Sequence, residues 1–141
     1  MDDQLSPAEY EQLTEHLVAR LAVYFGGRTS RLERNVKLPG FATTNEVDVT
    51  WEGTIGNSTH RLIFEAKRYK SRVTQGKLHA FTSVLRDIGR DIPTTGVFVA
   101  QNGFQSGARR VAAGYDVIVL EMRQPTTEDL QGRVTGIEVA I

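Results

Sequence analysis

Hydrophobic residues recur every three or four positions near the start of the chain, which is the spacing of one helix face. The run consists of Tyr10, Leu13, Leu17, Leu21 and Tyr24. Ser6, Pro7 and Glu9 precede it as a helix-start signal, since serine can cap, proline suits the first turn and glutamate completes a capping box. Gly26 and Gly27 mark the end. The pattern predicts an amphipathic helix.

Strict alternation of polar and apolar residues then predicts two strands. Glu46–Glu52 alternates at period two, followed by the turn-rich segment Gly53–Thr59 and a second strand over His60–Lys67. One face of the first strand is expected to carry Val47, Val49 and Trp51. The opposite face is expected to carry Glu46, Asp48 and Thr50. We expect the two strands to form an antiparallel hairpin.

The second half of the chain predicts helix, strand, short helix and strand. Leu78, Phe81, Leu85 and Ile88 have helical spacing within Thr74–Ile88, which Gly89 closes. Thr95–Gln101 and Asp116–Met122 are apolar runs of strand length. A short helix capped by Ser106 fits between them, so we expect a parallel pair with a right-handed crossover. Gln124–Gly132 is expected to be a loop, and Val134–Ile141 a final edge strand.

Composition narrows the class of protein. The 141 residues are 40% hydrophobic and 24% charged, which fits one domain over residues 1–141. The absence of Cys excludes disulfides and thiolate metal sites, so a metal must be held by oxygen or imidazole. His16, His60 and His79 have no metal-ligand spacing. The acidic N-terminus and short apolar runs lack the features of a secretory signal or a membrane span, so we expect a cytoplasmic protein.

Charge is segregated along a chain whose net charge is zero. Residues 1–19 hold five acids and no Lys or Arg, whereas residues 20–110 hold 15 Lys and Arg against seven acids. Arg61–Lys77 is the most basic stretch, with six basic residues and one acid, and Arg28–Lys37 is another. This basic centre fits a polyanion such as nucleic acid. A solvated surface with acidic ends folded against it explains the same pattern.

Candidate chemistry lies on the hairpin. Period two places Glu65 and Lys67 side by side on the second strand, and the hairpin can bring Asp48 near them. Two carboxylates converging on one point repel unless a cation neutralises them, and oxygen ligands favour Mg²⁺ or Mn²⁺. Such a metal would polarise a phosphodiester and activate water, while Lys67 orients the water or balances charge. The alternative is a surface ion pair among the same three residues.

Order and spacing resemble a known family. Asp48, then Phe64–Tyr69, then Gly96–Phe104 with Ala108 and Ala112, resemble the PD-(D/E)XK nuclease superfamily and, within it, the Mrr-like restriction endonucleases. The resemblance implies an α/β fold with a restriction-endonuclease-like mixed sheet of four to five strands flanked by helices. It also implies that Asp48, Glu65 and the carbonyl of Ala66 bind Mg²⁺ and that Lys67 is catalytic.

The resemblance implies a further acid on the first helix, and Glu11 matches it. Glu11 falls about 100° from Tyr10, at the edge of the apolar face. The alternative role for Glu11 is a favourable interaction with the helix dipole. Val47 stands where the superfamily has proline, and Thr43–Glu46 replaces a glycine-rich run.

The implied partner is DNA. Five residues are expected to contact it: Arg68, Lys70, Arg72, Gln75 and Lys77. The chain has no room for the winged-helix recognition domain of the full restriction enzymes, so specificity would come from a separate partner or be absent. Double-strand cleavage needs two active sites, which favours a homodimer.

Two functions remain open from sequence. The first is a Mg²⁺-dependent DNA endonuclease of the restriction, defence or repair type. The second is a non-catalytic nucleic-acid-binding or assembly module on the same fold. A small-molecule α/β enzyme lacks support, because G-x-G-x-x-G, P-loop and nucleophile-elbow motifs are absent.

Overall fold

The computed structural model describes residues 6–24, 26–88, 91–122 and 137–140. The N-terminal half holds α1 (Pro7–Tyr24), β1 (Arg28–Pro39), β2 (Thr44–Ile55) and β3 (Ser58–Lys67). The C-terminal half holds α2 (Gln75–Asp87), β4 (Thr94–Ala100), α3 (Ser106–Gly114), β5 (Ile118–Met122) and β6 (Ile137–Ala140). None of the described helices combines the length and apolar character needed to cross a lipid bilayer.

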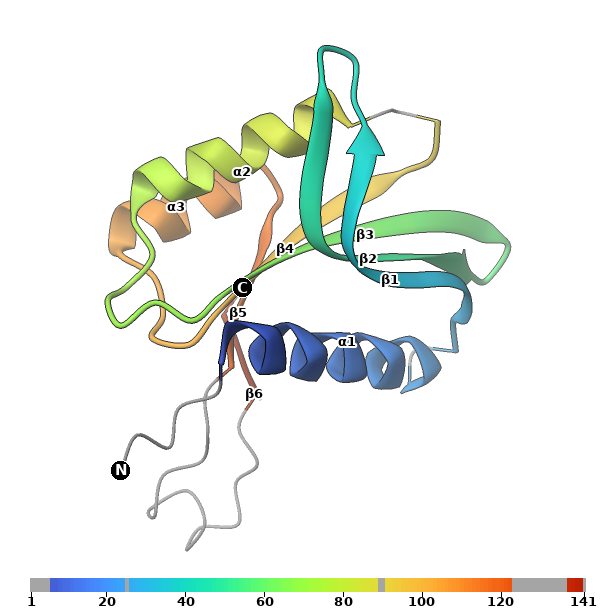
Figure 1. The fold of residues 1–141 in the computed structure, drawn as a ribbon, viewed down its shortest axis with the longest axis horizontal. Coiled ribbons are helices and arrows are strands. Elements are labelled where there is room, and N and C mark those ends of the chain that lie inside the picture. The colour runs from blue at the N-terminus through green and yellow to red at the C-terminus, as the bar shows by residue number, and fades with distance from the viewer. Residues whose placement is uncertain (1–5, 25, 89–90, 123–136, 141) are drawn as a thin grey trace, which may run out of the picture.

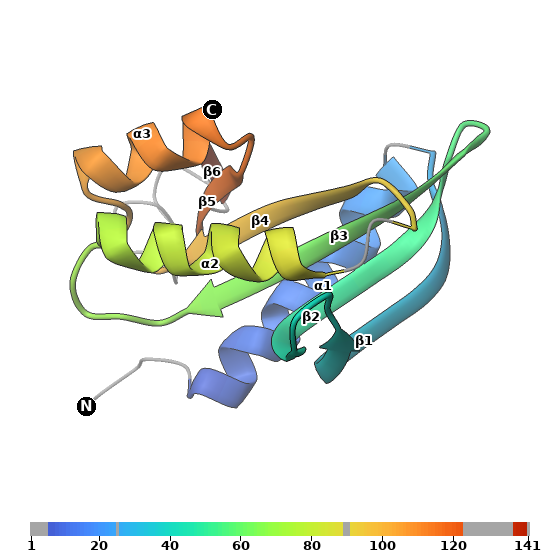
Figure 2. The same ribbon diagram turned by 90° about the horizontal axis from the view of Figure 1, so that it is seen from above.

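The strands form one mixed sheet in the order β1-β2-β3-β4-β5-β6. The first three strands pair antiparallel, β3 to β5 pair parallel, and β6 returns antiparallel on β5. Helix α1 covers one face, and α2 and α3 lie side by side on the other (Figures 1 and 2). The predicted α/β class, a mixed sheet flanked by helices, is therefore confirmed.

Each face of the sheet has its own apolar core. On the α1 face Tyr10, Trp51 and Phe64 are buried together. On the α2 and α3 face, Phe98 packs edge-to-face against Phe81 and Phe104, with ring centroids 5.5 and 5.7 Å apart. Phe98 is also the register partner of Glu65 across β3 and β4. This aromatic cluster therefore supports the sheet beneath the predicted site.

Helix α1 begins as the sequence predicts, but the face that it buries differs in part from the predicted one. The Ser6 hydroxyl accepts from the Glu9 backbone N–H at 3.1 Å, and Glu9 accepts from the Ser6 N–H at 3.0 Å, so the capping box is confirmed. The buried residues are Tyr10, Thr14 and Val18. The predicted apolar face is right at Tyr10, which is buried, and at Leu17, which packs against the core, but wrong at Leu13 and Tyr24, which are 42% and 82% exposed.

A hydrogen bond between residues far apart in the sequence holds α1 against the sheet. The Tyr10 hydroxyl donates to the Met122 carbonyl oxygen at 2.6 Å, which joins the first helix to the end of β5. Thr14 is fully buried because its hydroxyl donates to the Tyr10 carbonyl at 2.8 Å within the helix.

The hairpin, α2 and the parallel β4–β5 pair also match the sequence, and α2 begins at the Thr74 cap. The described sheet has six strands rather than four to five, because β1 is an edge strand whose basic residues hide its alternation. Gln105, not Ser106, caps α3, without a side-chain hydrogen bond. Gly89, Gln124–Gly132 and half of the predicted last strand, 134–136 and 141, lie outside the described residues, whereas β6 covers 137–140.

Val47 does not share a core with Val49 and Trp51. It belongs to the cluster against α2, whereas the other two belong to the cluster against α1. The pairing of β2 with β3 ends at Val49 and Phe64, while Val47 still pairs with Val36 of β1. The first strands bend at this end of the sheet (Figure 1), so strict alternation no longer tells which core a residue meets.

Two glycines test the packing of α2 on the sheet. A Cβ at Gly96 in β4 would lie 2.3 Å from Leu85 Cδ1 and 2.9 Å from Phe81 Cε2, whereas a Cβ at Gly76 in α2 meets nothing within 4 Å. Gly96→Ala should therefore destabilise the protein by about 1–3 kcal/mol through overpacking. Gly76→Ala should be neutral or stabilising, because alanine favours helix. Urea unfolding measures both, and equal midpoints would contradict this account of the core.

Candidate active site

The predicted carboxylates lie where β2 separates from β3. Asp48 is the next residue of β2 beyond the last pair, Val49 with Phe64. Its Oδ2 accepts a hydrogen bond from the backbone N–H of Ala66 at 2.9 Å. A buried backbone N–H needs an acceptor, so the carboxylate supplies one where the regular ladder stops. The opening between the strands thus fixes the position of Asp48.

One ammonium group joins the two acids. Lys67 Nζ lies 2.8 Å from Glu65 Oε1 and 3.4 Å from Asp48 Oδ2. Period two on β3 places Glu65 and Lys67 on the same face, and the hairpin supplies Asp48, as the sequence predicts. The three side chains therefore meet, while their catalytic role stays a prediction.

The three side chains are partly buried, which changes the pKa values of Glu65 and Lys67. The side chains of Asp48, Glu65 and Lys67 are 15%, 23% and 31% exposed. Burial raises the pKa of Glu65, the charge of Asp48 raises it further, and the hydrogen bond from Lys67 opposes both. Burial disfavours the charged form of Lys67, but its hydrogen bond to Glu65 and the two negative charges raise its pKa overall. The site holds two acids against one firmly protonated base.

The site opens into a hollow of about 260 Å³ between β3 and α2. Glu65 and Lys67 line it together with Tyr69 and Lys77, whose ammonium lies 4.5 Å from the centre of the Tyr69 ring. The wall therefore carries basic and acidic side chains side by side. Glu46 also lines the hollow, although the sequence assigns it no role. Its position two residues before Asp48, on the same predicted face, was the available signal.

Glu11 lies closer to the sheet than the leucine stripe suggests. The buried residues of α1 are centred near Thr14, about 60° from Glu11 around the helix. Glu11 is half-buried, and its negative charge contributes to the raised pKa of Glu65. Glu15, further round, pairs with Arg34 at 3.4 Å. Glu11 is therefore within electrostatic reach of the site, and its predicted role stays open.

The predicted DNA contacts are spread over two sides of the site. Lys77 lines the hollow. Arg68 is half-buried, and its charge lowers the pKa of Glu9 after the larger effect of the Ser6 hydrogen bonds, so it lies within electrostatic reach of the start of α1. Lys70 and Arg72 are exposed in the segment before α2. Gln75 Oε1 lies against α3, 2.5 Å from where a Cβ would stand on Gly107.

Within the described ranges, no group of three or more His, Asp or Glu side chains is close enough to form a metal site on its own. The donors that converge are the carboxylates of Asp48 and Glu65, and the backbone carbonyl of Ala66 lies between Glu65 and Lys67 in sequence. An all-oxygen set of this kind fits a hard divalent cation such as Mg²⁺, which keeps several waters when bound.

Comparison with known proteins identifies related chains. A family model described as a restriction endonuclease matches residues 3–124. No curated protein matches the chain.

Two solved structures resemble the fold. The crystal structure of AF1548, described as a protein of unknown function, has a TM-score of 0.58 at 18% identity, over 78% of this chain and 56% of that chain. Can2 from Sulfobacillus thermosulfidooxidans, solved with cyclic tetra-adenylate, has a TM-score of 0.58 at 14% identity, over 88% of this chain and 34% of its own. At these identities the likeness is one of fold. The chain therefore spans about half the length of AF1548 and about a third of the length of Can2.

Two variants of Asp48 can show whether it stabilises the fold through the hydrogen bond from the Ala66 N–H or through its charge. Asp48→Ala removes the acceptor of a buried N–H and should lower the free energy of unfolding by about 1–3 kcal/mol. Asp48→Asn keeps an acceptor oxygen and should stay close to the wild type. Chemical denaturation compares the two variants. Equal losses would show that Asp48 stabilises through its charge and not through this hydrogen bond.

Proposed function

Because this chain belongs to the restriction endonuclease family, we propose that it is a divalent-metal-dependent endonuclease that hydrolyses phosphodiester bonds of DNA in restriction, defence or repair. The family makes it a nuclease-type domain. The observation that carries the finer proposal is the convergence of Asp48 and Glu65 on the ammonium of Lys67. Two half-buried acids sharing one cation hold more negative charge than a structural ion pair needs.

The proposed metal is Mg²⁺ or Mn²⁺, held by Asp48, Glu65 and the carbonyl of Ala66. The raised pKa of Glu65 supports this choice, since burial and Asp48 penalise its negative charge and a divalent cation would relieve the penalty. When bound, the metal would polarise the scissile phosphate and activate a water molecule. Glu11 is proposed to assist from α1, where its charge already acts on Glu65.

The chain's own residues would do the rest. Lys67 stays protonated between the two acids, so it can donate hydrogen bonds to a phosphate oxygen and balance charge that develops there. Asp48 is aligned by the Ala66 N–H, which limits its rotation. Lys77 at the wall of the hollow would hold a neighbouring phosphate.

The remaining proposed DNA contacts are Arg68, Lys70, Arg72 and Gln75. The exposed Lys70 and Arg72 suit backbone phosphates, which give affinity without sequence preference. Sequence specificity would then come from a separate partner. A homodimer would supply the second active site that double-strand cleavage requires.

One observation favours the alternative of a non-catalytic nucleic-acid-binding module. Lys67 already bonds to both carboxylates, and the described residues offer no third acidic or histidine ligand in contact. In that case the acids would serve to hold Lys67 for phosphate binding. Binding without turnover distinguishes this function from the first.

Cleavage of plasmid DNA tests the proposal. The wild type should nick or linearise plasmid DNA in the presence of Mg²⁺, and addition of a chelator should stop this cleavage. Glu65→Gln and Lys67→Ala should each lower the rate at least about 100-fold, because each removes a charge that acts in the transition state. Glu33→Gln is the matched control, since Glu33 pairs with Arg31 on the surface at 2.7 Å. Activity that survives chelator and both substitutions would refute the metal mechanism, and inactivity with retained DNA binding would favour the module.

Metal binding has a readout that needs no turnover. Saturating Mg²⁺ should raise the melting temperature of the wild type by about 2–4 °C, because a ligand of the folded state stabilises it. The double variant Asp48→Asn with Glu65→Gln should show no shift, while Glu33→Gln should behave like the wild type. Differential scanning calorimetry measures all three. Equal shifts in every variant would place the metal elsewhere.

A further inference from the structure

The loop that joins β1 to β2 carries an unusually exposed aromatic ring. Phe41 is 98% exposed, more than the other large apolar residues that the structure describes. Exposing a phenyl ring to water is unfavourable, and a single exposed ring is tolerable without a role. The surroundings of this ring indicate that it has one.

The loop is held in place by Asp87 at the end of α2. The Asp87 carboxylate accepts from the backbone N–H groups of Ala42 at 2.6 Å and Thr43 at 3.2 Å, and from Asn45 Nδ2 at 2.8 Å. The Phe41 N–H donates to the Asp87 carbonyl at 2.6 Å. A Cβ at Gly40 would lie 2.2 Å from Asp87 Oδ2, so glycine is required there. The ring therefore stands on a fixed support.

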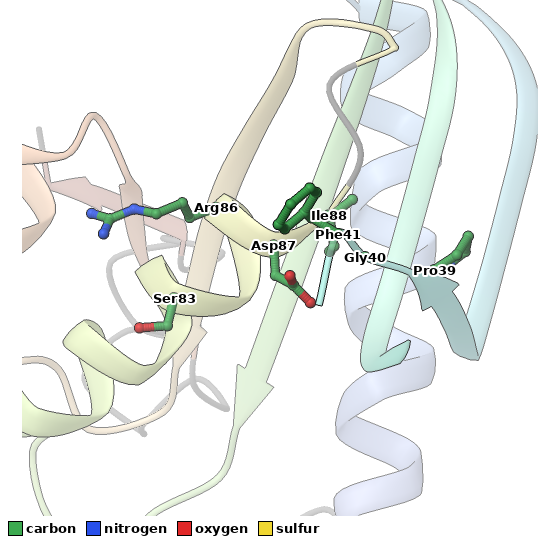
Figure 3. A pocket seen from close by; sticks show the side chains of 7 residues that line it. All are labelled: Pro39, Gly40, Phe41, Ser83, Arg86, Asp87 and Ile88. Atoms are coloured by element: carbon green, nitrogen blue, oxygen red, sulfur yellow. The ribbon is translucent and has the colours of Figure 1, made fainter. Parts of the chain in front are cut away.

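Beside the ring is an open groove of about 800 Å³ (Figure 3). Its lining is mainly apolar, from residues such as Pro39, Phe41 and Ile88, and it includes the exposed Arg86. Asp87 also lines it, but that carboxylate is engaged by three donors. The groove therefore offers an aromatic face, and the exposed Arg86 lies at its edge with its guanidinium group directed away from Phe41 (Figure 3), which suits a base on the ring and a phosphate next to it.

Helix α2 connects this groove to the candidate active site. Ala80 and Val84 line the hollow at Glu65 and Lys67, while Ser83 and Asp87, from overlapping turns of the same helix, line the groove. Ten residues separate Lys77 from Asp87, which is about 15 Å along a helix. A stacked nucleic-acid strand advances about 3.4 Å per nucleotide, so this length corresponds to about four nucleotides.

We propose that Phe41 stacks on an unpaired base of the DNA strand, about four nucleotides from the phosphate held at Lys77, with Arg86 on the phosphate beside that base. This inference rests on the proposed nuclease function and names its substrate class. A phenyl ring can stack only on a base whose face is open, and the bases of an intact duplex are stacked on one another. The preferred substrate is therefore DNA with a single-stranded segment next to a duplex.

Binding measured in chelator tests the inference without cleavage. Fluorescence anisotropy compares a blunt duplex with the same duplex carrying a single-stranded tail. Phe41→Ala should weaken binding of the tailed DNA about tenfold and leave the blunt duplex unchanged, whereas Phe41→Trp should keep the affinity. Tyr24→Ala is the control, an 82% exposed aromatic that precedes β1, at the opposite end of the β1–β2 ladder from Phe41. With 2-aminopurine along the tail, quenching should appear about four to five nucleotides from the cleaved phosphate in the wild type and be lost in Phe41→Ala.

Three results would overturn the inference. If Phe41→Ala binds tailed DNA like Tyr24→Ala while the wild type still cleaves plasmid, the stacking role fails and the proposed function stands. If the wild type binds neither DNA, the proposed function fails and the inference with it. If Phe41→Ala converts a dimer into a monomer in light scattering, the groove is an interface between copies of this chain.

Discussion

The fold is organised around one constraint, which is that two acids must be held close together beside one ammonium group. Asp48 and Glu65 repel each other, and Lys67 bonds to both. The geometry requires two adjacent strands that part at one position, a backbone N–H to align Asp48, and a firm support beneath Glu65. The β2–β3 hairpin, Ala66 and the Phe98 cluster supply these in turn. The sheet can be understood as a frame that holds like charges together.

The other half of the same hairpin shows what a purely structural arrangement of charges looks like. There, Arg61 Nε lies 3.0 Å from Glu52 Oε1, and Arg31 Nη1 also approaches that oxygen at 3.5 Å. Arg31 also bonds to Glu33 and Arg61 to Asp91, so this network holds two bases and three acids, and the two outer acids are 48% and 68% exposed. At Lys67 two carboxylates share one base, and all three side chains are less than a third exposed. The excess negative charge therefore faces solvent in the first network and is held partly buried at Lys67.

The meeting of Asp48, Glu65 and Lys67 could be predicted from the sequence better than the packing around them. Period two on β3 and a short hairpin suffice to bring Asp48, Glu65 and Lys67 together, since both depend on local geometry. The leucine stripe misled because burial in α1 is decided by the sheet it meets: Thr14 is buried through a hydrogen bond to its own helix, and Leu13 is not. The strand β1 was not predicted because it lies at the edge of the sheet, where most of its side chains are exposed and its basic residues hide the polar–apolar alternation. The anchoring of the Phe41 loop depends on Asp87, 46 positions further along the chain, which no local pattern reveals.

The Tyr10 hydroxyl and the Met122 carbonyl, 112 positions apart, have an implication for biosynthesis. The first helix emerges early from the ribosome, yet its anchor on the sheet does not exist until β5 has been made. Glu11, next to Tyr10, is therefore fixed near Glu65 only after β5 has been made. A nascent chain that ends before β5 can form the hairpin, but it lacks the Tyr10 anchor that positions Glu11.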